Sequence, residues 1–512
     1  MNTNLEKSRQ LFEEGLTLLK KSNFSEAVIK FNEALLLAPD RISILVNLSA
    51  GLIELGRWSE CEKICNKILS IEPENYDAIL NLGICLSHKQ NNLKALELFN
   101  QAIFLNPHLD SAWVNKGIIM QTLDNYEEAE KCFNKAISLN PLSQEALVGK
   151  GSLYVESKDY KKALEAFDRA LELNSLNSLA KWNKALLLIR LGNFAEGWRL
   201  YESRWEIAGI RESKKHSDIQ LWLGGKDIRN KSILIYAEQG YGDTIQFCRY
   251  LPLIEKLGAT VIFEVPKPLL KLMKFLSPSI LVIENKATNF NQINTSADFQ
   301  CPIMSLPLAF KTSLSTIPNS IPYLSTDVSN STNWNKKLSE LSSANRTGSH
   351  FRIGIAWSGS GHYAGKLNNR RDIALQDVIE TLNPFILQGV EVHSLQINPS
   401  ANDLRMFSAS RIFSHHNSIH DFSDTACLIE ELDVIISIDT AIAHLAGALG
   451  KNTWILIPNP SDFMVLIDQQ THPWYPNSIL FHQETPNDWK IPLKKISNKL
   501  KNLLNQRATN AV

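Results

Sequence analysis

The sequence predicts an α-helical solenoid in the N-terminal part of the chain and two α/β domains with parallel sheets after it. The first observation is a set of residue types that recurs every 34 residues, from position 8 to about position 211. The second is an alternation of short apolar runs with amphipathic stretches from about Lys231 onward, which is typical of parallel sheets. The length of 512 residues is too great for a single hydrophobic core.

Four columns of residues share the interval in the N-terminal part. Proline recurs at positions 39, 73, 107 and 141. Small residues form a column at Gly15, Ser49, Gly83, Gly117, Gly151 and Ala185. Alanine or a near substitute recurs at Ala27, Cys61, Ala95, Ala129 and Ala163, and an aromatic residue at Phe24, Trp58, Tyr126, Tyr160 and Phe194. Small residues let two helices approach closely and proline ends a helix, so the pattern resembles tetratricopeptide repeats, each a helix–turn–helix unit.

Six repeats can be placed, at residues 8–41, 42–75, 76–109, 110–143, 144–177 and 178–211. The sixth loses the alanine and proline columns, and its second half reads NFAEGWRLYESRW. A terminal repeat that departs from the pattern usually caps the stack or joins another domain. We expect Trp198, Tyr201 and Trp205 to dock on the domain that follows.

An asparagine column marks the first helix of four repeats, at Asn47, Asn81, Asn115 and Asn183. First helices line the concave surface of such solenoids, and an amide can pair with both the donors and the acceptors of an extended peptide. The column therefore predicts that the repeats bind a protein or peptide. The alternative is that these amides only bridge neighbouring helices.

The remaining chain reads as two series of strands and helices. In the first series SILIYAEQ, ATVIFEV and SILVIE are predicted strands, and TIQFCRYLPLIEKLG is a predicted helix. Residues 311–350 are rich in Ser, Thr, Asn and Pro and predict a linker with a short helix around Trp334. The second series contains the predicted strands FRIGIAWSG, GVEVHSLQI, RIFSH, LDVIISI and NTWILIP. The predicted domains are 8–211, 212–345, 346–490 and a C-terminal helix at 491–512.

The amino-acid composition limits the partners and the cellular compartment that we expect for the protein. Lys+Arg and Asp+Glu balance at 53 each, which argues against nucleic acid as the main partner. The seven cysteines are scattered without a CxxC pair, so we expect the chain to work in the reducing cytoplasm. Cys61 and Cys65 lie one turn apart in a predicted helix and are expected to pack inside the protein. No apolar run is long enough to span a membrane, and no secretory signal is apparent.

Three motifs follow predicted strands, where open α/β sheets bind ligands. The first is GYGDT, in which Gly240 and Gly242 could turn backbone N–H groups toward an anion; alternatively, Asp243 or Thr244 only caps a helix. The second, DTAIAHLAG, places Thr440 and His444 on one helix face after Asp439; alternatively, it is a capped core helix with a buried histidine. The third is the loop WSGSGH with the cations that follow it, and alternatively that loop is only surface. Its candidate ligands are Ser358, His362, Lys366, Arg370 and Arg371.

These motifs, in this order behind repeats, resemble a bacterial family of repeat-containing glycosyltransferase-like proteins. The C-terminal half is similar to the heptosyltransferase group and, more distantly, to the O-GlcNAc transferases. The matching stretches are LYESRW, AEQGYGDTIQFCRYLPLI, GIAWSGSGHY, NRRDIAL, DFSDTACLIEELDVIISIDTAIAHLAGALG and WYPNSILF. The resemblance implies a GT-B architecture, in which two Rossmann-like domains hold a nucleotide-sugar between them.

The resemblance also implies the roles of single residues. Asp243 takes the place of the proposed catalytic base. Asp439, Thr440 and His444 take the place of donor contacts, and Lys366 or Arg371 would neutralise the diphosphate. The sequence departs from relatives at Tyr241, Asp372 and Phe463, where a small aliphatic residue, serine and tryptophan are usual.

Two functions follow as expectations. The first is a metal-independent glycosyltransferase, hexosyl- or heptosyl-transferring, that uses no cofactor besides its nucleotide-sugar substrate and whose repeats recruit the acceptor. No motif has the spacing of metal ligands. The second is a protein-interaction scaffold whose glycosyltransferase-like domain is inactive.

Overall fold

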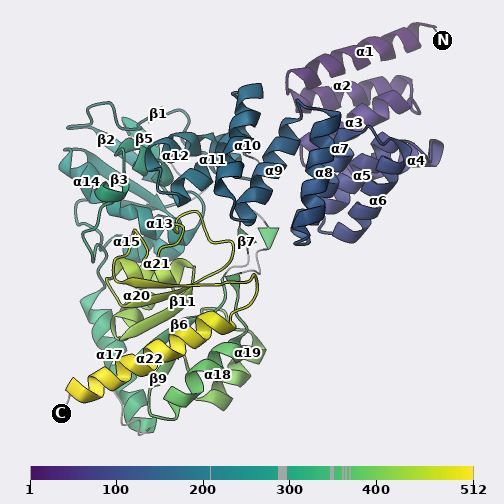
Figure 1. Ribbon diagram of the computed structural model, residues 1–512. Coiled ribbons are helices and arrows are strands. Elements are labelled where there is room, and N and C mark those ends of the chain that lie inside the picture. Colours follow the sequence, from purple (N-terminus) through teal and green to yellow (C-terminus); the bar gives the residue numbers. More distant parts are fainter. Residues whose placement is uncertain are drawn as a thin grey trace. The chain divides into compact units, whose positions relative to one another are not determined.

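The computed structural model describes residues 2–207, 209–285, 297–345, 351–359, 362–363, 366–367 and 371–510. The chain forms two compact units, residues 1–183 and 184–512, which are described separately (Figure 1). The predicted domain limits at 211, 345 and 490 stay predictions.

The first unit is built of antiparallel helix pairs, and each second helix starts 34 residues after the preceding one. Five of these second helices begin at the aromatic column, which confirms that the column opens them. The helices are α1 (Asn2–Lys20), α2 (Phe24–Leu37), α3 (Ile42–Glu54), α4 (Trp58–Ile71), α5 (Tyr76–His88), α6 (Asn92–Leu105), α7 (Asp110–Thr122), α8 (Tyr126–Leu139), α9 (Gln144–Glu156), α10 (Tyr160–Leu173), α11 (Ser178–Arg190) and α12 (Phe194–Tyr201). The second unit begins within α11 and includes α12.

The small-residue column is explained by a second aromatic column that was not noticed in the sequence. Phe31, Phe99, Phe133 and Phe167 are fully buried at 34-residue multiples. A Cβ atom added to Gly15, Gly83, Gly117 or Gly151 would lie only 2.4–2.8 Å from a ring carbon of these phenylalanines. In the second repeat, Ser49 stands in the small-residue column and Cys65 in the phenylalanine column. Serine is larger than glycine and cysteine is smaller than phenylalanine, so the two changes compensate each other in volume.

The second unit contains two parallel sheets, as an α/β fold requires. The first sheet has the strand order β1-β5-β2-β3-β4 and the second the order β10-β9-β6-β11-β12-β13. The first comprises β1 (Gln220–Leu221), β2 (Ser232–Tyr236), β3 (Thr260–Val265), β4 (Leu281–Glu284) and β5 (Phe299–Pro302). The second comprises β6 (Arg352–Ala356), β9 (Glu391–Ser394), β10 (Phe413–Ser414), β11 (Val434–Ile438), β12 (Thr453–Ile457) and β13 (Ser478–His482). Strands β1, β5 and β13 were not predicted.

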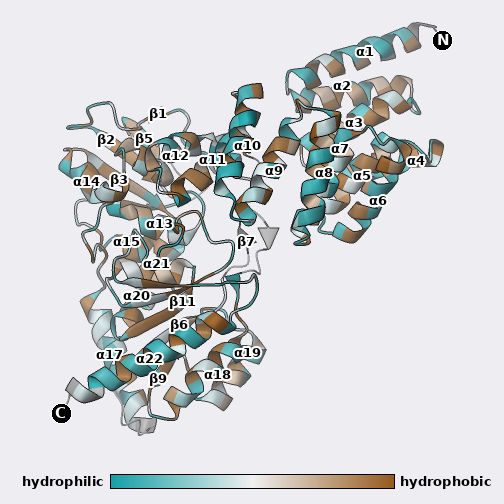
Figure 2. Ribbon diagram, viewed as in Figure 1, coloured by the Kyte–Doolittle hydropathy of each residue, from teal (hydrophilic) through white to brown (hydrophobic). Residues whose placement is uncertain are grey.

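Helices cover both sheets, and the apolar strands are brown in Figure 2 while α22 alternates between teal and brown. The α-helices after α12 are α13 (Tyr241–Phe247), α14 (Leu251–Lys256), α15 (Leu270–Met273), α16 (Leu306–Ala309), α17 (Val328–Asn345), α18 (Leu375–Ile386), α19 (Ala401–Ser410), α20 (Phe422–Glu430), α21 (Ala441–Ala448) and α22 (Lys490–Asn510). A short antiparallel pair, β7 (His362–Tyr363) and β8 (Lys366–Leu367), lies in the loop after β6.

Two local predictions were wrong. The short helix expected around Trp334 is α17, which has 18 residues. Burial of Trp334 and Leu338 stabilises this helix although its sequence is rich in Ser and Asn. The helix expected from Thr244 begins earlier, at Tyr241, and is interrupted by a 3₁₀ turn at Cys248–Tyr250, just before Pro252.

Candidate functional site

The candidate site lies where the loops that follow β2 and β11 meet, so it draws on loops from both parallel sheets. Helix α13 follows β2, and helix α21 follows β11. The two helices are so close that a Cβ atom added to Gly242 would lie 2.7 Å from Cδ2 of His444. Gly242 is therefore needed for the contact between the helices, which brings Asp243 and Asp439 to the same place.

Three carboxyl groups and one guanidinium gather at this junction. Burial raises the pKa of Asp243 to about 7, and the carboxylate of Asp462 adds to that rise. Burial and Asp462 likewise raise the pKa of Asp439 to about 7. Burial also raises the pKa of Asp462, whereas the Arg371 guanidinium opposes the rise at all three carboxyls. Like charges in a small volume cannot all ionise easily, so this cluster holds protons at neutral pH.

The loop after β6 contributes Arg371 and Gly359 to the junction. Arg371 Nη1 donates a hydrogen bond of 3.0 Å to the carbonyl oxygen of Asp439. A Cβ atom added to Gly359 would lie 3.4 Å from Cγ2 of Thr440. Thr440 is the N-cap of α21 but makes no side-chain capping bond, and its hydroxyl lies 3.3 Å from that of Ser437. The structure thus brings together predicted residues from all three motifs.

Some predicted ligands are engaged within the protein. The amide of Gly240 donates to Asp243 Oδ2 at 3.0 Å, so Asp243 does cap α13, as the alternative interpretation holds. Ser358 donates its hydroxyl to Asp372 Oδ2 at 3.1 Å, and the amide of Gly359 donates to Oδ1 at 3.0 Å. Asp372 therefore organises the start of this loop.

The side chains of His362 and Lys366 lie outside the described part of the structure, which gives only their backbone in β7 and β8. Arg370 is outside the described residues altogether. Their predicted contacts with a donor stay predictions.

His444 is connected to a buried network of hydrogen bonds. The Nδ1 atom of His444 is 3.1 Å from the hydroxyl oxygen of Tyr475, which in turn is 3.4 Å from the hydroxyl oxygen of Tyr323. Arg249 lies beside both rings and donates to the Trp474 carbonyl at 2.7 Å and to Tyr323 Oη at 3.0 Å. Arg249 lies in the 3₁₀ turn that follows α13, after a strand of the first sheet. Trp474 and Tyr475 lie between β12 and β13 of the second sheet, so these contacts join the two sheets of the unit.

Burial, followed by the charges of Arg249 and Arg371, lowers the pKa of His444 to about 3. The imidazole is therefore neutral at neutral pH. Its Nε2 lies 3.8 Å from Asp439 Oδ1, which is too long for a hydrogen bond, and the neutral ring forms no ion pair with that carboxyl.

The LYESRW motif holds the loop after β2 in place through the contact between Arg204 and Glu238. Arg204 is completely buried and donates from Nε and Nη2 to the two carboxylate oxygens of Glu238, both at 2.9 Å. Burial alone would lower the pKa of Arg204, but the carboxylates of Glu238 and Glu202 outweigh it and the pKa is raised. Trp198 and Tyr201 are buried against Phe247 and Phe463, which confirms their expected docking, and Trp205 is also buried.

The sequence motifs missed Asp462, Arg249 and Glu238 as parts of this junction. A signal existed for Arg249, because a single cation interrupts the apolar run TIQFCRYLPLI. Asp462 precedes Phe463, whose ring stacks on Tyr201 at a centroid distance of 5.5 Å.

The asparagine column makes two kinds of contact. Asn81 and Asn183 donate to the hydroxyls of Ser49 and Ser152 on neighbouring first helices, at 2.9 and 3.1 Å. Asn47 and Asn115 donate to carbonyl oxygens one turn back in their own helices, each at 2.8 Å. The bridging alternative therefore describes half of the column.

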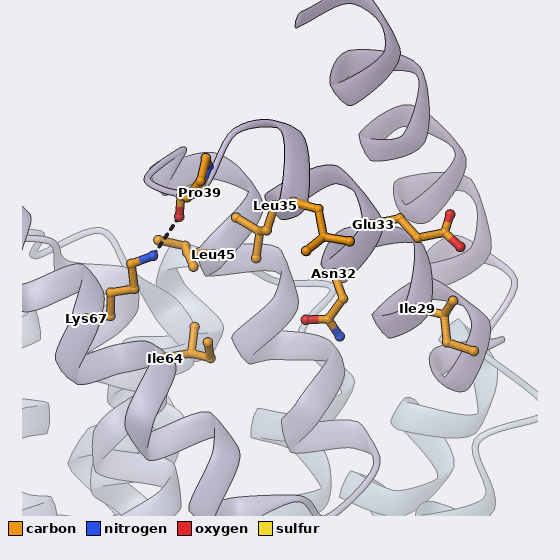
Figure 3. A pocket seen from close by; sticks show the side chains of 9 residues that line it. Ile29, Asn32, Glu33, Leu35, Pro39, Leu45, Ile64 and Lys67 are labelled. Atoms are coloured by element: carbon orange, nitrogen blue, oxygen red, sulfur yellow. Dashed lines mark hydrogen bonds between the residues drawn. The ribbon is translucent and has the colours of Figure 1, made fainter. Parts of the chain in front are cut away.

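The first unit also has an open pocket of about 430 Å³ (Figure 3). Its walls come mainly from α2 and α4, and Lys67 closes one side through a 2.7 Å hydrogen bond to the Pro39 carbonyl. Leu36 is 83% exposed at its rim. The pocket is mostly apolar and lacks a cluster of catalytic groups among its lining residues.

The described residues hold neither a cluster of metal ligands nor a membrane-spanning helix. Within them no group of three or more His, Cys, Asp or Glu side chains could hold a metal ion. In the same residues no helix is both long and apolar enough to cross a bilayer. All seven cysteines are buried free thiols, which confirms the predicted packing of Cys61 and Cys65.

Comparison with protein families identifies the N-terminal repeats. The family model described as tetratricopeptide repeat matches residues 121–175 and 149–209. The N-terminal region therefore contains tetratricopeptide repeats, which are protein-interaction modules.

A curated relative extends further along the chain. Protein FlbA of Caulobacter vibrioides is 23% identical over 336 residues, which cover 61% of this chain and 53% of FlbA. The chain thus spans about half the length of this curated relative.

Among solved structures, the tetratricopeptide-repeat protein TTC0263 of Thermus thermophilus is 18% identical, with a TM-score of 0.34. The alignment covers 36% of this chain and 99% of that chain. YrrB, described as a tetratricopeptide-repeat protein with an unusual peptide-binding site, is 21% identical, with a TM-score of 0.26 and coverage of 34% and 90%.

Proposed function

We propose that the chain is a metal-independent glycosyltransferase of the GT-B type, which transfers a hexosyl or heptosyl group from a nucleotide-sugar to an acceptor hydroxyl. One observation carries the proposal. Asp243 and Asp439 follow strands of two different parallel sheets, yet both join Arg371 and His444 at one junction. Ligands of open α/β sheets bind at the carboxyl ends of the strands, so a donor held there would touch both sheets.

Asp243 serves as the general base in this proposal. A carboxyl with a pKa of about 7 is partly ionised at neutral pH and is well matched to accept a proton there. It takes the proton of the acceptor hydroxyl while that oxygen forms a bond to the anomeric carbon. The bond from the anomeric carbon to the diphosphate oxygen breaks, and its electron pair leaves with the nucleoside diphosphate.

Negative charge then grows on the leaving diphosphate. The guanidinium of Arg371, the N–H groups in the first turn of α21 after Thr440, and His444 are the groups proposed to stabilise it. Losing one such preorganised donor typically costs about 3 kcal/mol, or roughly a hundredfold in rate. The three neighbouring carboxyls do not exclude a diphosphate, because their raised pKa values let them bind it in a partly protonated state.

The repeats supply the acceptor in this proposal. Tetratricopeptide repeats bind proteins or peptides along an extended surface, so we infer that the acceptor hydroxyl belongs to a protein, or to a glycan on a protein, that the first unit recruits.

The test is thermal unfolding of the full chain in the presence of UDP-, GDP- and ADP-sugars. A true donor at a hundred times its dissociation constant stabilises the folded state by about 2.7 kcal/mol. The Arg371→Met variant should lose most of this stabilisation, whereas Arg169→Met, at an exposed position of α10, should keep it. A wild-type protein that responds to none of these sugars contradicts the proposal.

The second candidate is an interaction scaffold with an inactive transferase-like unit. The observation that favours it is that the Gly240 amide and the Ser358 hydroxyl already bond to the protein's own carboxylates. The two candidates differ in the same experiment, because a scaffold binds a protein through its repeats and gives no response to any nucleotide-sugar.

A further inference from the structure

The two nitrogens of the neutral His444 ring have different surroundings. Nδ1 points away from the junction, 3.1 Å from the hydroxyl oxygen of Tyr475. Nε2 lies on the junction side, 3.8 Å from Asp439 Oδ1 and beside the first turn of α13 at Gly242. A neutral imidazole has one N–H, and the hydrogen bond made by one nitrogen decides whether the other carries it.

The proton of Tyr475 has two acceptors within reach. Burial raises the pKa of this phenol well above its ordinary value, so the hydroxyl keeps its proton. The Tyr323 oxygen, at 3.4 Å, already accepts from Arg249 Nη2 at 3.0 Å and gives its own proton to the Ile245 carbonyl at 3.0 Å. His444 Nδ1 is closer, at 3.1 Å.

Two neighbouring charges favour the same direction. The Arg249 guanidinium lies 4.8 Å from the centre of the Tyr475 ring, and its charge opposes the rise in the pKa of that phenol, which makes the hydroxyl a better hydrogen-bond donor. The Asp439 carboxylate, when ionised, attracts a proton on the Nε2 side of His444.

We infer that the hydroxyl of Tyr475 donates to Nδ1 of His444 and thereby holds the imidazole in the tautomer that carries its proton on Nε2. Tyr475 is a positioning residue that acts only through His444. The N–H at Nε2 faces the junction and donates to the diphosphate of the bound nucleotide. This last step rests on the proposed function, whereas the tautomer does not.

The tautomer is tested first by nitrogen NMR of the full chain labelled with ¹⁵N-histidine, with the His444→Gln variant used to assign the signals. We expect His444 to show a protonated Nε2 and an unprotonated Nδ1, and the Tyr475→Phe variant to show a mixture of the two forms. A wild-type spectrum with the proton on Nδ1 overturns the inference.

The positioning role is tested by a double-mutant cycle on binding of UDP, GDP, ADP and CDP. Glutamine at position 444 offers an amide N–H but has no tautomers. Tyr475→Phe should therefore weaken binding about fivefold in the wild-type background, the effect of one hydrogen bond, and less than twofold in the His444→Gln background. An equal loss in both backgrounds means that Tyr475 acts on the fold and overturns the role.

A matched control separates stability from positioning. Tyr250→Phe also removes a buried hydroxyl, which lies 2.7 Å from Thr312 Oγ1, and should leave nucleotide binding unchanged. If no nucleoside diphosphate binds the wild type, the proposed function fails, and the NMR result still decides the tautomer.

Discussion

The two units of the chain bury polar side chains in opposite ways. Among the described residues before position 184, the buried polar side chains are neutral: Ser8, Ser49, Asn81 and Ser143. The second unit buries charged groups, among them Arg204, Glu238, Arg249, Glu391 and Asp439. Buried charge costs free energy unless it is paired, so the second unit depends on ion pairs and hydrogen bonds such as Arg204–Glu238, whereas the first unit does not.

The largest expected difference between the two units is catalytic, and it depends on the charged junction of the second unit. Asp243→Asn removes the proposed base, and general base catalysis contributes roughly a hundred- to ten-thousandfold. We therefore expect about a thousandfold loss of turnover with any donor that the wild type uses. The exposed Asp377→Asn substitution serves as the control, and full activity in Asp243→Asn would rule out the role of this carboxyl.

The largest effect on stability is expected at the buried pair behind the junction. Arg204→Met leaves Glu238 buried without its bidentate partner, which costs about 4 kcal/mol in the unfolding of the second unit. The double variant Arg204→Met, Glu238→Gln should recover part of this loss, because the uncompensated charge is gone. Chemical denaturation measures both, and a loss under about 1 kcal/mol for the single variant contradicts the assignment.

The stability of the second unit should also depend on pH through Asp439. Its folded pKa of about 7 lies above the unfolded value of about 3.9, so the folded state binds more protons between these values. Stability from this group is present at low pH and is lost as the pH rises through about 7. The Asp439→Asn variant should thus gain about 2 kcal/mol relative to wild type between about pH 5 and pH 8. A difference that stays constant with pH would show that the pKa is not raised.

The first unit should respond to volume rather than to charge. Gly151→Ala places a methyl group 2.4 Å from a ring carbon of Phe167, so we expect a loss of about 2 kcal/mol. Phe167→Leu in the Gly151→Ala background should restore part of it, whereas Ser138→Ala on an exposed helix face should change little. Urea unfolding would detect the difference, and an unaffected Gly151→Ala variant contradicts the close contact.

The smallest expected effect on stability distinguishes asparagines that bridge two helices from those that bond within their own helix. Asn81→Ala breaks a bridge to Ser49 and should cost about 1 kcal/mol, whereas Asn115→Ala loses only a bond within its own helix and should cost less. If Asn115→Ala instead abolishes capture of a protein partner without a change in stability, the column serves binding at that position.

The sequence predicted the first unit better than the junction of the second. The repeats depend on local spacing, and each substitution in the small-residue column reports on a contact made sixteen residues later, such as Gly151 with Phe167. The strand–turn–helix motifs gave Asp243, Asp439 and His444, because each follows an apolar strand. Asp462 and Tyr475 escaped notice as members of the junction, since only the tertiary fold brings their loops to α21.

The Ser- and Asn-rich α17 shows the limit of composition. Its sequence favours a linker, but the burial of Trp334 and Leu338 outweighs the weak helix propensity of its neighbours. Local preferences decide a helix only where tertiary contacts do not.

The position of Phe133 has a consequence for how the solenoid could change its length. A Cβ atom at Gly117, in the same repeat, or at Gly149, in the next one, would lie 2.8 or 2.5 Å from its ring. A gene duplication that copies one complete repeat reproduces the first kind of contact and only has to create the second at a single new seam. Growth by whole repeats is thus easy to accommodate, while an insertion between a glycine and its aromatic partner disrupts the contact that spans it.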